Sequence, residues 1–534
     1  MPEWSSAIVD RIQMETHFDG RELKCFTDRP ADLNAMFAAA VARAPDDEAV
    51  VSGETRFTYT SFDHVVGRIA AGLKANGIVK GDRVALLISN RWEFTAVMMG
   101  CLRLGAIAVP INIRESAPEL EFILQQCGAR IVVHGMDVAD RLPERRALPA
   151  LEHIYCVGGD VDGSQPFSDL MADAPFTGVV EVDEEDVAVI LYTSGTTGQP
   201  KGATLTHFNI VHSTLHFEAA MELGANERSL LCVPASHVTG LIATVFTSIH
   251  TAGCAVMMET FAAHEFLTLV ADEKVTLTLM VPAMYNLFLL RCNLADYDLA
   301  AWRIGGYGGA PMAQSTIAEL SEKLPNLCLM NAYGATELTS AVTILPIGYG
   351  VSRSDSIGVA MPCAEIRLVD EKGQDVPEGE HGELWIKSPM TVPGYWNNPE
   401  RTQGEFQDGY WKSGDMGSRD AEGFICLHDR RKDMIIRGGY NIYSVEVENA
   451  LMAHPSVIEC AAIGRPDPVL GEKMHVFIHT TDTTLDRDAI RAFAKSKMAD
   501  YKAPDFVTFD PEPLPRNANG KIVKNTLRAS LQES

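Results

Sequence analysis

The sequence predicts an α/β protein, with a large N-terminal domain of layered α/β subdomains and a β-rich subdomain, followed by a small mobile α+β domain. Three observations lead to this prediction. The 534 residues are too many for one compact core. Short apolar runs typical of buried strands alternate with helical patterns. A charged run at 429–433 precedes a separate α+β pattern of ordinary domain size. We therefore expect a domain at 1–428 and a second domain at 434–534, and the charged run at 429–433 is either a hinge between them or a solvated turn.

The clearest alternation of strands and helices lies in the first third of the chain. It predicts strands at 84–88, 106–109 and 130–133 and helices at 92–104 and 116–128. Gly105 and Gly128 end these two helices, and Ser116 can cap the second. This βαβαβ pattern requires a parallel sheet covered by helices. An alternating stretch at 49–59 is typical of a hairpin.

A second α/β unit and a β-rich part follow. The apolar runs predict strands at 230–233, 255–258, 276–281 and 302–304. Short strands and turns at 357–387 predict the β-rich subdomain. The C-terminal pattern predicts helices at 444–452 and 488–498 and strands at 457–463 and 475–478.

Composition excludes several classes of partner. The net charge of −26 argues against non-specific binding to nucleic acid or to an anionic membrane surface. The 11 cysteines are scattered without a CxxC pair or a zinc-like cluster, which favours reduced thiols. No signal-peptide pattern is evident at the N-terminus, and the longest apolar stretch, 94–111, is interrupted by polar residues, glycine and proline. We expect a cytoplasmic protein without a membrane span.

The strongest chemical signal is the stretch 193–202, Thr-Ser-Gly-Thr-Thr-Gly-Gln-Pro-Lys-Gly. It follows a strand pattern at 187–192 and precedes a helical pattern at 205–222, so we expect a loop between a strand and a helix. Glycines let backbone N–H groups approach a ligand, hydroxyls add donors, and Lys201 adds positive charge, which suits a polyphosphate. The alternative is a flexible surface loop. No GxxxxGK[ST] motif occurs, which disfavours a P-loop NTPase.

Two further stretches follow apolar runs. The glycine-rich segment 305–311 can let a flat ligand lie against the backbone, or it is a tight turn. In the segment 331–337, the asparagine can recognise the edge of a base, Thr336 can donate to a phosphate oxygen, and Glu337 can hold a divalent cation. The alternative for that segment is a polar loop that caps a helix.

Three single residues each allow two interpretations. Asp415, with Arg430, can accept hydrogen bonds from both hydroxyls of a ribose, or it is an ordinary turn residue. Lys521 is either a catalytic lysine in a C-terminal loop or an exposed side chain. His237 is either a core histidine or part of a pocket wall.

In this order and at these spacings, the motifs between residues 192 and 521 together resemble those of the adenylate-forming acyl-CoA synthetase superfamily. That superfamily includes fatty acid and aryl acid CoA ligases, firefly luciferase and the adenylation domains of peptide synthetases. The resemblance implies three small-molecule partners, namely ATP with Mg²⁺, a carboxylic acid and coenzyme A. A homodimer is one open alternative for the assembly.

The resemblance also implies roles for individual residues. Lys521 would bridge the substrate carboxylate and the α-phosphate, Thr336 would contact the α-phosphate, and Glu337 would bind Mg²⁺. Lys432 falls at the hinge position. The residues implied in ATP binding are Thr193, Ser194, Gly195, Thr196, Thr197, Gly198, Lys201, Gly309, Ala310, Pro311, Asn331, Ala332, Tyr333, Gly334, Thr336, Asp415, Arg430 and Lys521. Those implied in the acyl pocket are His237, Tyr307, Gly308 and Ala332, and those along the pantetheine tunnel are Gly438, Gly439 and Tyr440.

The implied reaction activates a carboxylic acid as an acyl adenylate and then transfers the acyl group to coenzyme A, releasing AMP and pyrophosphate. Amino-acid-activating relatives carry aspartate at the position of His237, so histidine there disfavours an amino acid. The apolar neighbours Val238 and Met284 suggest an aromatic or medium-chain acid. Two alternatives stay open. One is an acyl-AMP ligase that delivers to a carrier protein or to oxygen, and the other is a non-catalytic ATP-binding protein.

Overall fold

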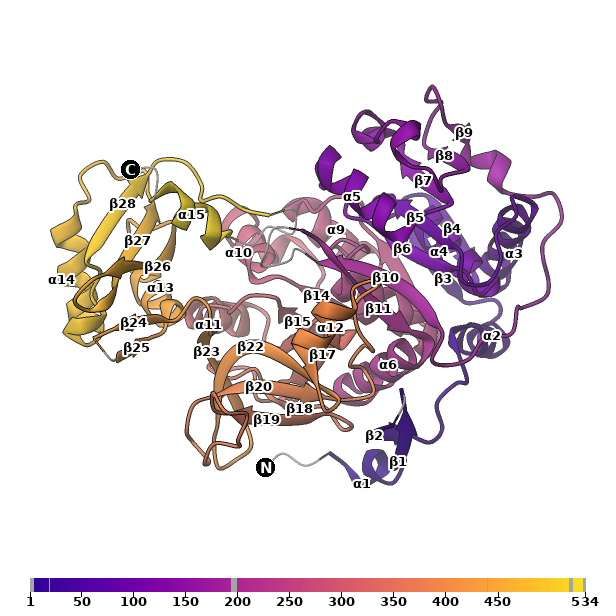
Figure 1. The fold of residues 1–534 in the computed structure, drawn as a ribbon. Helices are drawn as coiled ribbons and strands as arrows, with labels where there is room; N and C mark the ends of the chain where they lie inside the picture. Colours follow the sequence, from indigo (N-terminus) through magenta and orange to yellow (C-terminus); the bar gives the residue numbers. More distant parts are fainter. Residues whose placement is uncertain (1–3, 19, 194–198, 439, 518–521, 532–534) are drawn as a thin grey trace. The chain divides into compact units, whose positions relative to one another are not determined.

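A computed structural model describes residues 4–18, 20–193, 199–438, 440–517 and 522–531 (Figure 1). The chain forms two compact units. The first contains Met1–Ile366 and Ile386–Trp411, and the second contains Arg367–Trp385 and Lys412–Ser534. The predicted fold class is confirmed, because a large mixed α/β part with several sheets precedes a small α+β C-terminal part. A hinge at 429–433 and domain limits at 428 and 434 stay predictions.

A seven-stranded sheet in the first unit contains the predicted βαβαβ pattern. Its strand order is β11-β10-β6-β5-β7-β8-β9, and all neighbours are parallel except β10 and β11. The strands are β5 (Arg83–Leu87), β6 (Ile107–Pro110), β7 (Ile131–Gly135), β8 (His153–Val157), β9 (Gln165–Pro166), β10 (Val187–Thr193) and β11 (Lys201–Thr206). The helices beside them are α3 (Tyr59–Ala75), α4 (Trp92–Arg103) and α5 (Ala117–Cys127). The capping box of Ser116 and Glu119 begins α5, and Gly128 ends it with a φ of 64°.

A nine-stranded sheet in the same unit has the order β18-β17-β16-β15-β14-β12-β13-β3-β4. The neighbours from β16 to β3 are parallel, whereas β4, β17 and β18 are antiparallel to theirs. The strands are β3 (Glu48–Ser52), β4 (Thr55–Thr58), β12 (Arg228–Leu231), β13 (Cys254–Met257), β14 (Leu277–Met280), β15 (Ile304–Gly308), β16 (Cys328–Ala335), β17 (Ser340–Ile344) and β18 (Val359–Ala360). The crossover helices are α9 (Ala263–Asp272), α10 (Pro282–Arg291) and α11 (Gln314–Lys323). The predicted hairpin at 49–59 is β3 and β4.

The predicted loop between a strand and a helix at 193–202 is wrong in one respect. The loop connects two antiparallel strands, β10 and β11, and helix α6 (His207–Met221) begins only after β11. The backbone of β11 also bonds to a distant segment, with Trp396 N–H donating to Gly202 at 2.7 Å and Thr204 N–H donating to Gly394 at 3.1 Å. Pairing on both sides therefore makes 201–206 a strand, so the loop does not lie at a helix N-terminus.

The glycine-rich segment 305–311 is also partly strand. Residues up to Gly308 belong to β15, and the backbone turns left-handed only at Gly309, with a φ of 76°. A Cβ on Gly308 would lie 2.3 Å from the carbonyl oxygen of Ala332 on β16, so only glycine fits this close strand pair.

The short N-terminal hairpin of β1 (Ile12–His17) and β2 (Arg21–Phe26) packs near α6. Three buried histidines of α6 each accept a backbone hydrogen bond from another segment. His207 accepts from Leu33 at 3.3 Å, His212 accepts from Phe26 at 3.3 Å, and His216 accepts from Cys363 at 3.1 Å. Burial lowers the pKa of His207 and of His216 to about 4, and it lowers the pKa of His212 well below its ordinary value. All three are therefore neutral acceptors that join separate segments to one helix.

These histidines should make the first unit sensitive to acid. An unfolded histidine binds a proton below about pH 6.5, whereas the folded pKa is near 4 for His207 and His216. The free energy of unfolding should therefore be at its plateau above about pH 6.5 and decrease by roughly 3 kcal/mol per histidine toward pH 4. Urea unfolding across this range measures the effect. His216→Gln should reduce the slope, and exposed His264→Gln should not; a flat profile for the unmodified protein would contradict the assignment.

Shorter elements complete the first unit. The remaining α-helices are α1 (Ser6–Val9), α2 (Leu33–Arg43), α7 (Val238–Gly240), α8 (Thr247–Thr251) and α12 (Pro399–Glu405). Single 3₁₀ or π segments lie at Met136–Arg141, Arg145–Ala147, Phe167–Leu170, Leu241–Phe246, Leu294–Asp296 and Thr336–Leu338. All 11 cysteines lie in the described part of the chain and carry free thiols, as the scattered pattern predicts.

Two five-stranded sheets follow along the chain. The first has the order β19-β20-β22-β21 with β23 beside β22, and it agrees with the predicted β-rich subdomain. Its strands are β19 (Glu365–Val369), β20 (Gly382–Lys387), β21 (Phe406–Gln407), β22 (Tyr410–Arg419) and β23 (Ile425–Arg430). The second has the order β25-β24-β27-β26 with β28 beside β27. Its strands are β24 (Ile435–Arg437), β25 (Tyr440–Ile442), β26 (Glu459–Asp467), β27 (Gly471–His479) and β28 (Phe506–Asp510).

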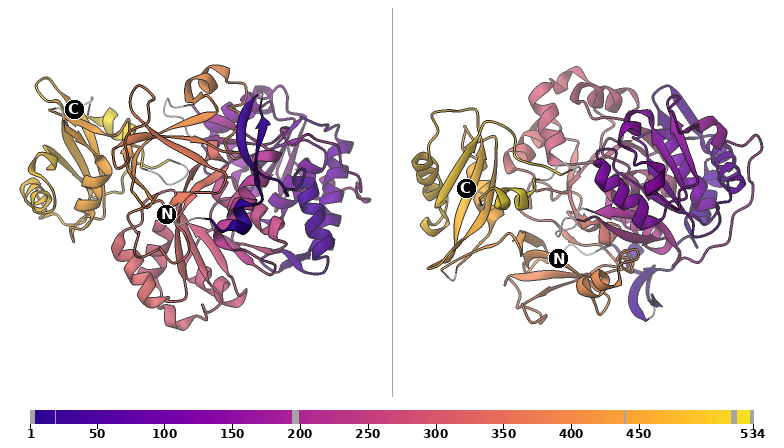
Figure 2. Two further views of the ribbon diagram at one scale, coloured as in Figure 1. Left: turned by 90° about the horizontal axis from the view of Figure 1, so that it is seen from below. Right: turned by 45° about the horizontal axis from the view of Figure 1, so that its top comes forward.

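The second of these sheets carries helices on both faces (Figure 2). The apolar side chains of α13 (Ser444–Met452) and α14 (Arg487–Lys497) pack with one face, and Leu527 of α15 (Lys524–Ser530) packs with the other. Lys524 contacts Glu448 at 2.7 Å and Ser444 at 2.6 Å, and Arg528 contacts Asp433 at 2.6 Å. Helix α15 is thus fixed by polar contacts at both of its ends. A 3₁₀ turn lies at Asp500–Lys502.

Candidate active site

The phosphate-loop candidate lies between the paired ends of β10 and β11. Thr193 is the last residue of β10 and lies opposite Lys201, the first residue of β11. In the described part of the chain, the buried Oγ1 of Thr193 has no hydrogen-bond partner. A buried hydroxyl left unpaired at the start of such a loop fits a ligand that accepts a hydrogen bond there. Five further residues predicted to bind the phosphates lie outside the described residues, namely Ser194, Gly195, Thr196, Thr197 and Gly198.

Lys201 and Glu337 were predicted separately, and the structure brings them together. The Nζ of Lys201 lies 2.9 Å from the Oε1 of Glu337, which is only 5% exposed. Glu337 sits in the 3₁₀ turn Thr336–Leu338, directly after β16, and Lys201 comes from the neighbouring β11. A cation suited to phosphate and an oxygen ligand suited to Mg²⁺ therefore meet at one place.

Two residues of this cluster were not predicted. The hydroxyl of Tyr395 lies 2.6 Å from Lys201 and 2.7 Å from Glu337, and Glu405 lies 2.7 Å from Lys201. Burial, followed by the two carboxylates, raises the pKa of Tyr395 far above its ordinary range. Burial alone would raise the pKa of Glu405, but hydrogen bonds from Lys201 and Tyr395 outweigh it, so the pKa of Glu405 is lowered. Tyr395 is thus a neutral phenol and Glu405 a carboxylate at neutral pH.

The predicted adenine-binding residues lie at the carboxyl ends of β15 and β16. These strands are parallel, and Gly308 is opposite Ala332. Crevices beyond such strand ends are common ligand sites in α/β sheets. The amide of Asn331 donates to the carbonyl of Ser356 at 2.9 Å. A Cβ on Gly334 would lie 1.7 Å from the carbonyl of Ser340, so this position requires glycine. Adenine binding stays a prediction for the residues at these strand ends, which are Gly309, Ala310, Pro311, Asn331, Ala332, Tyr333 and Gly334.

Two predicted acyl-pocket residues have well-defined surroundings. Tyr307 is 1% exposed and lies in the hydrophobic cluster that contains Tyr285. Within the described part, its hydroxyl has no hydrogen-bond partner. His237 precedes α7, and its Nδ1 accepts a hydrogen bond from the backbone of Thr239 at 3.3 Å. Roles in acid binding for His237, Tyr307, Gly308 and Ala332 stay predictions.

The remaining predicted residues belong to the second unit. Asp415 on β22 is opposite Arg430 on β23, and their side chains form an ion pair at 3.0 Å. Asp415 is buried and Arg430 is half exposed. The exposed Tyr440 stacks on Tyr501 with 4.6 Å between ring centroids. Their ribose and pantetheine roles, and those of Lys432 and Gly438, stay predictions. Gly439 and Lys521 lie outside the described residues.

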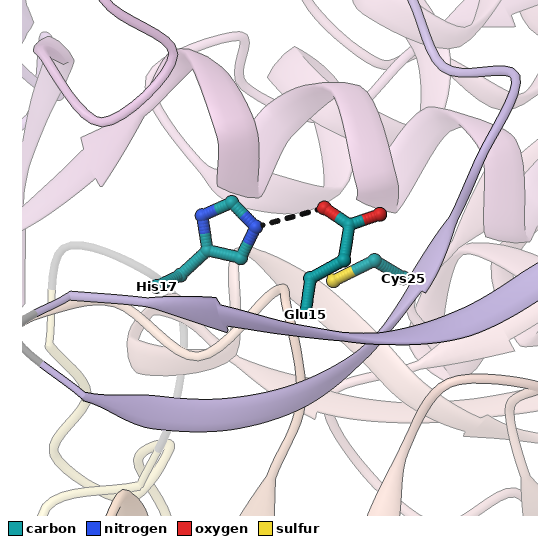
Figure 3. A group of neighbouring side chains, drawn as sticks. All are labelled: Glu15, His17 and Cys25. Atoms are coloured by element: carbon teal, nitrogen blue, oxygen red, sulfur yellow. Dashed lines mark hydrogen bonds and ion pairs between the residues drawn. The ribbon is translucent and has the colours of Figure 1, made fainter.

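A separate group of metal-ligating side chains lies on the N-terminal hairpin (Figure 3). Ligand atoms of Glu15, His17 and Cys25 lie within 4.8 Å of one another. However, Arg29 pairs with Glu15 at 2.7 Å, and its hydrogen bond holds the pKa of Glu15 at about 2. His17 lies between Glu15 at 3.1 Å and Glu185 at 3.0 Å, and burial raises the pKa of the Cys25 thiol to about 12. Arg29 already supplies the cation, and the thiol stays protonated, so the group is a structural ion-pair cluster.

Known proteins share both the sequence and the fold of this chain. The family described as AMP-binding enzyme matches residues 37–396, and the AMP-binding enzyme C-terminal domain matches residues 446–521. A feruloyl-CoA synthase of Amycolatopsis sp is 34% identical over 91% of this chain and 96% of that protein. The long-chain-fatty-acid–CoA ligase FadD13 of Mycobacterium tuberculosis is 34% identical over 89% of this chain and 93% of that protein.

A solved structure agrees with these relatives. The o-succinylbenzoate coenzyme A synthetase MenE from Bacillus subtilis, in complex with ATP and a magnesium ion, matches with a TM-score of 0.82 and 28% identity, over 92% of this chain and 98% of that chain. The chain therefore belongs to the AMP-binding enzyme family, the adenylate-forming superfamily. It is an AMP-forming acid–CoA ligase. None of the described helices is both long enough and apolar enough to cross a membrane.

Proposed function

We propose that the enzyme activates an apolar carboxylic acid, either aromatic or medium-chain, with ATP, and then transfers the acyl group to coenzyme A. The products are acyl-CoA, AMP and pyrophosphate. The observation that carries the proposal is the contact between Lys201 and Glu337 at the end of the 193–201 loop. Within the described residues, the Oγ1 of Thr193 at the other end of this loop has no hydrogen-bond partner, which supports the proposal.

The chemistry explains why these residue types are needed. A carboxylate that attacks the α-phosphate is an anion approaching an anion, so positive charge must offset the charge that develops. Lys201 supplies one such charge to the β- and γ-phosphates. The carboxylate oxygens of Glu337 suit Mg²⁺, which would supply further charge neutralisation when it is bound. Thr336 donates to the α-phosphate, and Lys521 bridges the acid and the α-phosphate.

The residues of the second unit serve binding and the change between steps. Asp415 accepts hydrogen bonds from the ribose hydroxyls, and Arg430 fixes its carboxylate through the ion pair at 3.0 Å. Adenylation needs Lys521 at the reacting groups, whereas thioester formation needs room for a thiol. A hinge at Lys432 would let one domain present each face in turn. Gly438, Gly439 and Tyr440 would then line the path of the pantetheine.

The choice of acid rests on the relatives and on the small side chain at Ala332. One relative is named for ferulic acid and another for long-chain fatty acids. These names support an acid with a large apolar body. His237 disfavours an amino acid, because amino-acid-activating relatives carry aspartate at this position. A cytoplasmic location stays a prediction. A homodimer also stays a prediction, since the structure describes a single copy of the chain.

Enlarging Ala332 should narrow the acid specificity. Ala332 is 7% exposed at the end of β16. In Ala332→Leu, the larger side chain should lower kcat/KM for the largest acids by about 10-fold or more and favour smaller acids. The KM for ATP should change far less than the preference among acids, because the other predicted nucleotide-binding residues are unchanged. If the relative kcat/KM values for the different acids stayed unchanged, the prediction that Ala332 lines the acyl pocket would be wrong.

A panel of carboxylic acids, assayed for AMP release with and without coenzyme A, tests the function. Sustained AMP release that requires coenzyme A, with an apolar acid preferred, is the expected result. AMP release that requires a carrier protein instead would favour the acyl-AMP ligase. A preference for short polar acids would contradict the proposed substrate class.

A further inference from the structure

The ammonium group of Lys201 donates two hydrogen bonds and forms an ion pair with a third side chain. It donates to Tyr395 at 2.6 Å and to Glu405 at 2.7 Å, and it lies 2.9 Å from Glu337. The side chain of Lys201 is 13% exposed. A lysine side chain has four rotatable bonds and loses rotamer entropy when it is fixed. This arrangement therefore holds an otherwise flexible cation in one place.

Glu405 links this cation to a second one. Its Oε2 contacts Lys201, and its Oε1 contacts Arg401 at 2.8 Å, one turn earlier on α12. Glu405 and Glu337 thus balance the charges of Lys201 and Arg401 within one cluster. The side chain of Asn398 caps the N-terminus of α12 by accepting a hydrogen bond from the backbone N–H of Arg401 at 3.1 Å. This cap stabilises the short helix that carries Glu405.

Tyr395 connects the cluster to β11, the strand that follows the phosphate-loop candidate. The residues on either side of it bond to the backbone of β11, through Trp396 to Gly202 and Thr204 to Gly394. Its phenol can donate only one proton, and its oxygen accepts from Lys201, so it connects the amine with one of the two carboxylates. The tyrosine is therefore positioned by the same strand that carries Lys201.

We propose that Glu405 and Tyr395 are positioning residues that orient Lys201 toward the phosphates of ATP. This inference rests on the proposed function of Lys201. Glu337 has a second task as an oxygen ligand, so Glu405 and Tyr395 are the two acceptors that hold the amine while its third N–H is directed at a phosphate oxygen. Neither residue touches the reacting atoms, and each acts through Lys201.

The main test is Glu405→Gln with Glu400→Gln as the matched control, since Glu400 is an exposed residue of the same helix. Glu405→Gln should lower kcat by about 10-fold, because the amine is no longer held where charge develops. The Kd of a fluorescent ATP analogue should change by less than about 3-fold. Losing the negative charge of Glu405 favours binding of the anionic phosphates, and this offsets the weaker fixing of the Lys201 amine. Tyr395→Phe removes no charge, but it removes the hydroxyl that accepts from Lys201, so it should also lower kcat. Glu400→Gln should match the parent.

A double mutant separates positioning from a general structural effect. In the Lys201→Met background, adding Glu405→Gln should lower kcat no further, because the residue acts only through the amine. An equal loss in both backgrounds would overturn the inference, as would an unchanged kcat in the single variant.

A second measurement does not depend on the identity of the acid. Labelling of Lys201 by acetic anhydride, followed by peptide mass spectrometry, should increase severalfold in Glu405→Gln and stay unchanged in Glu400→Gln. If no acid in the panel yields AMP, the proposed function fails while this measurement still decides whether Glu405 fixes the amine. Equal labelling of the parent and Glu405→Gln would overturn the inference.

Discussion

Replacing Glu337 by glutamine is expected to lower kcat for acyl-CoA formation by about 10²- to 10³-fold. The carboxylate is buried and lies 2.9 Å from Lys201 and 2.7 Å from Tyr395. Glutamine keeps the shape of the side chain but removes the charged oxygen that suits Mg²⁺. It also removes the negative charge that pairs with Lys201. The concentration of Mg²⁺ needed for half-maximal rate should rise with the loss of kcat, which steady-state assays over a Mg²⁺ series measure.

A matched control separates chemistry from stability. Glu93 is another buried glutamate of the first unit, and it pairs with Arg91 at 3.1 Å. Glu93→Gln should change the melting temperature by an amount similar to Glu337→Gln and leave the Mg²⁺ dependence as it was. If Glu337→Gln kept kcat and the Mg²⁺ requirement of the parent, the proposed metal ligand would be wrong.

Replacing Lys521 by alanine should separate the two half-reactions. We expect ATP–pyrophosphate exchange to fall by about 10²- to 10³-fold, because the substitution removes the cation that we propose bridges the acid and the α-phosphate. Thioester formation from supplied acyl adenylate should stay within about 2-fold of the parent, since the proposed hinge motion takes the lysine away before the thiol enters. Rapid-quench assays of each half-reaction measure both rates.

The control for this substitution is Lys495→Ala, an exposed lysine of α14 in the same unit. It should leave both half-reactions unchanged. Equal losses in the two half-reactions of Lys521→Ala would show that the lysine does not act in adenylation alone.

Local periodicity was enough to predict the elements that depend on near neighbours. The strands and helices between residues 84 and 133 follow from alternating apolar runs and from Gly128, because each element is decided within about a dozen residues. Helix α13 likewise has the predicted limits, Ser444–Met452. Strand β11 was missed because its second partner, the segment around Gly394, is almost 200 residues away in the sequence.

The site shows the same difference between local and distant information. Lys201 and Glu337 could be predicted as candidate site residues because each stands in a motif whose residue types suit one ligand. Tyr395 and Glu405 could not, because a tyrosine beside glycine and a glutamate at the end of a short helix carry no signal of their own. Their importance follows only from folding, which brings residues about 200 positions apart within hydrogen-bond distance of Lys201.

Helix α15 has a practical consequence for protein engineering. It begins three residues after Lys521 and is fastened through Lys524 to Ser444 and Glu448 and through Arg528 to Asp433. A shortened chain that stops before Lys524 would leave Glu448, a carboxylate whose pKa burial raises, without its lysine. Affinity tags and fusion partners are therefore better joined at the opposite terminus, where they leave the contacts of α15 with Ser444, Glu448 and Asp433 intact.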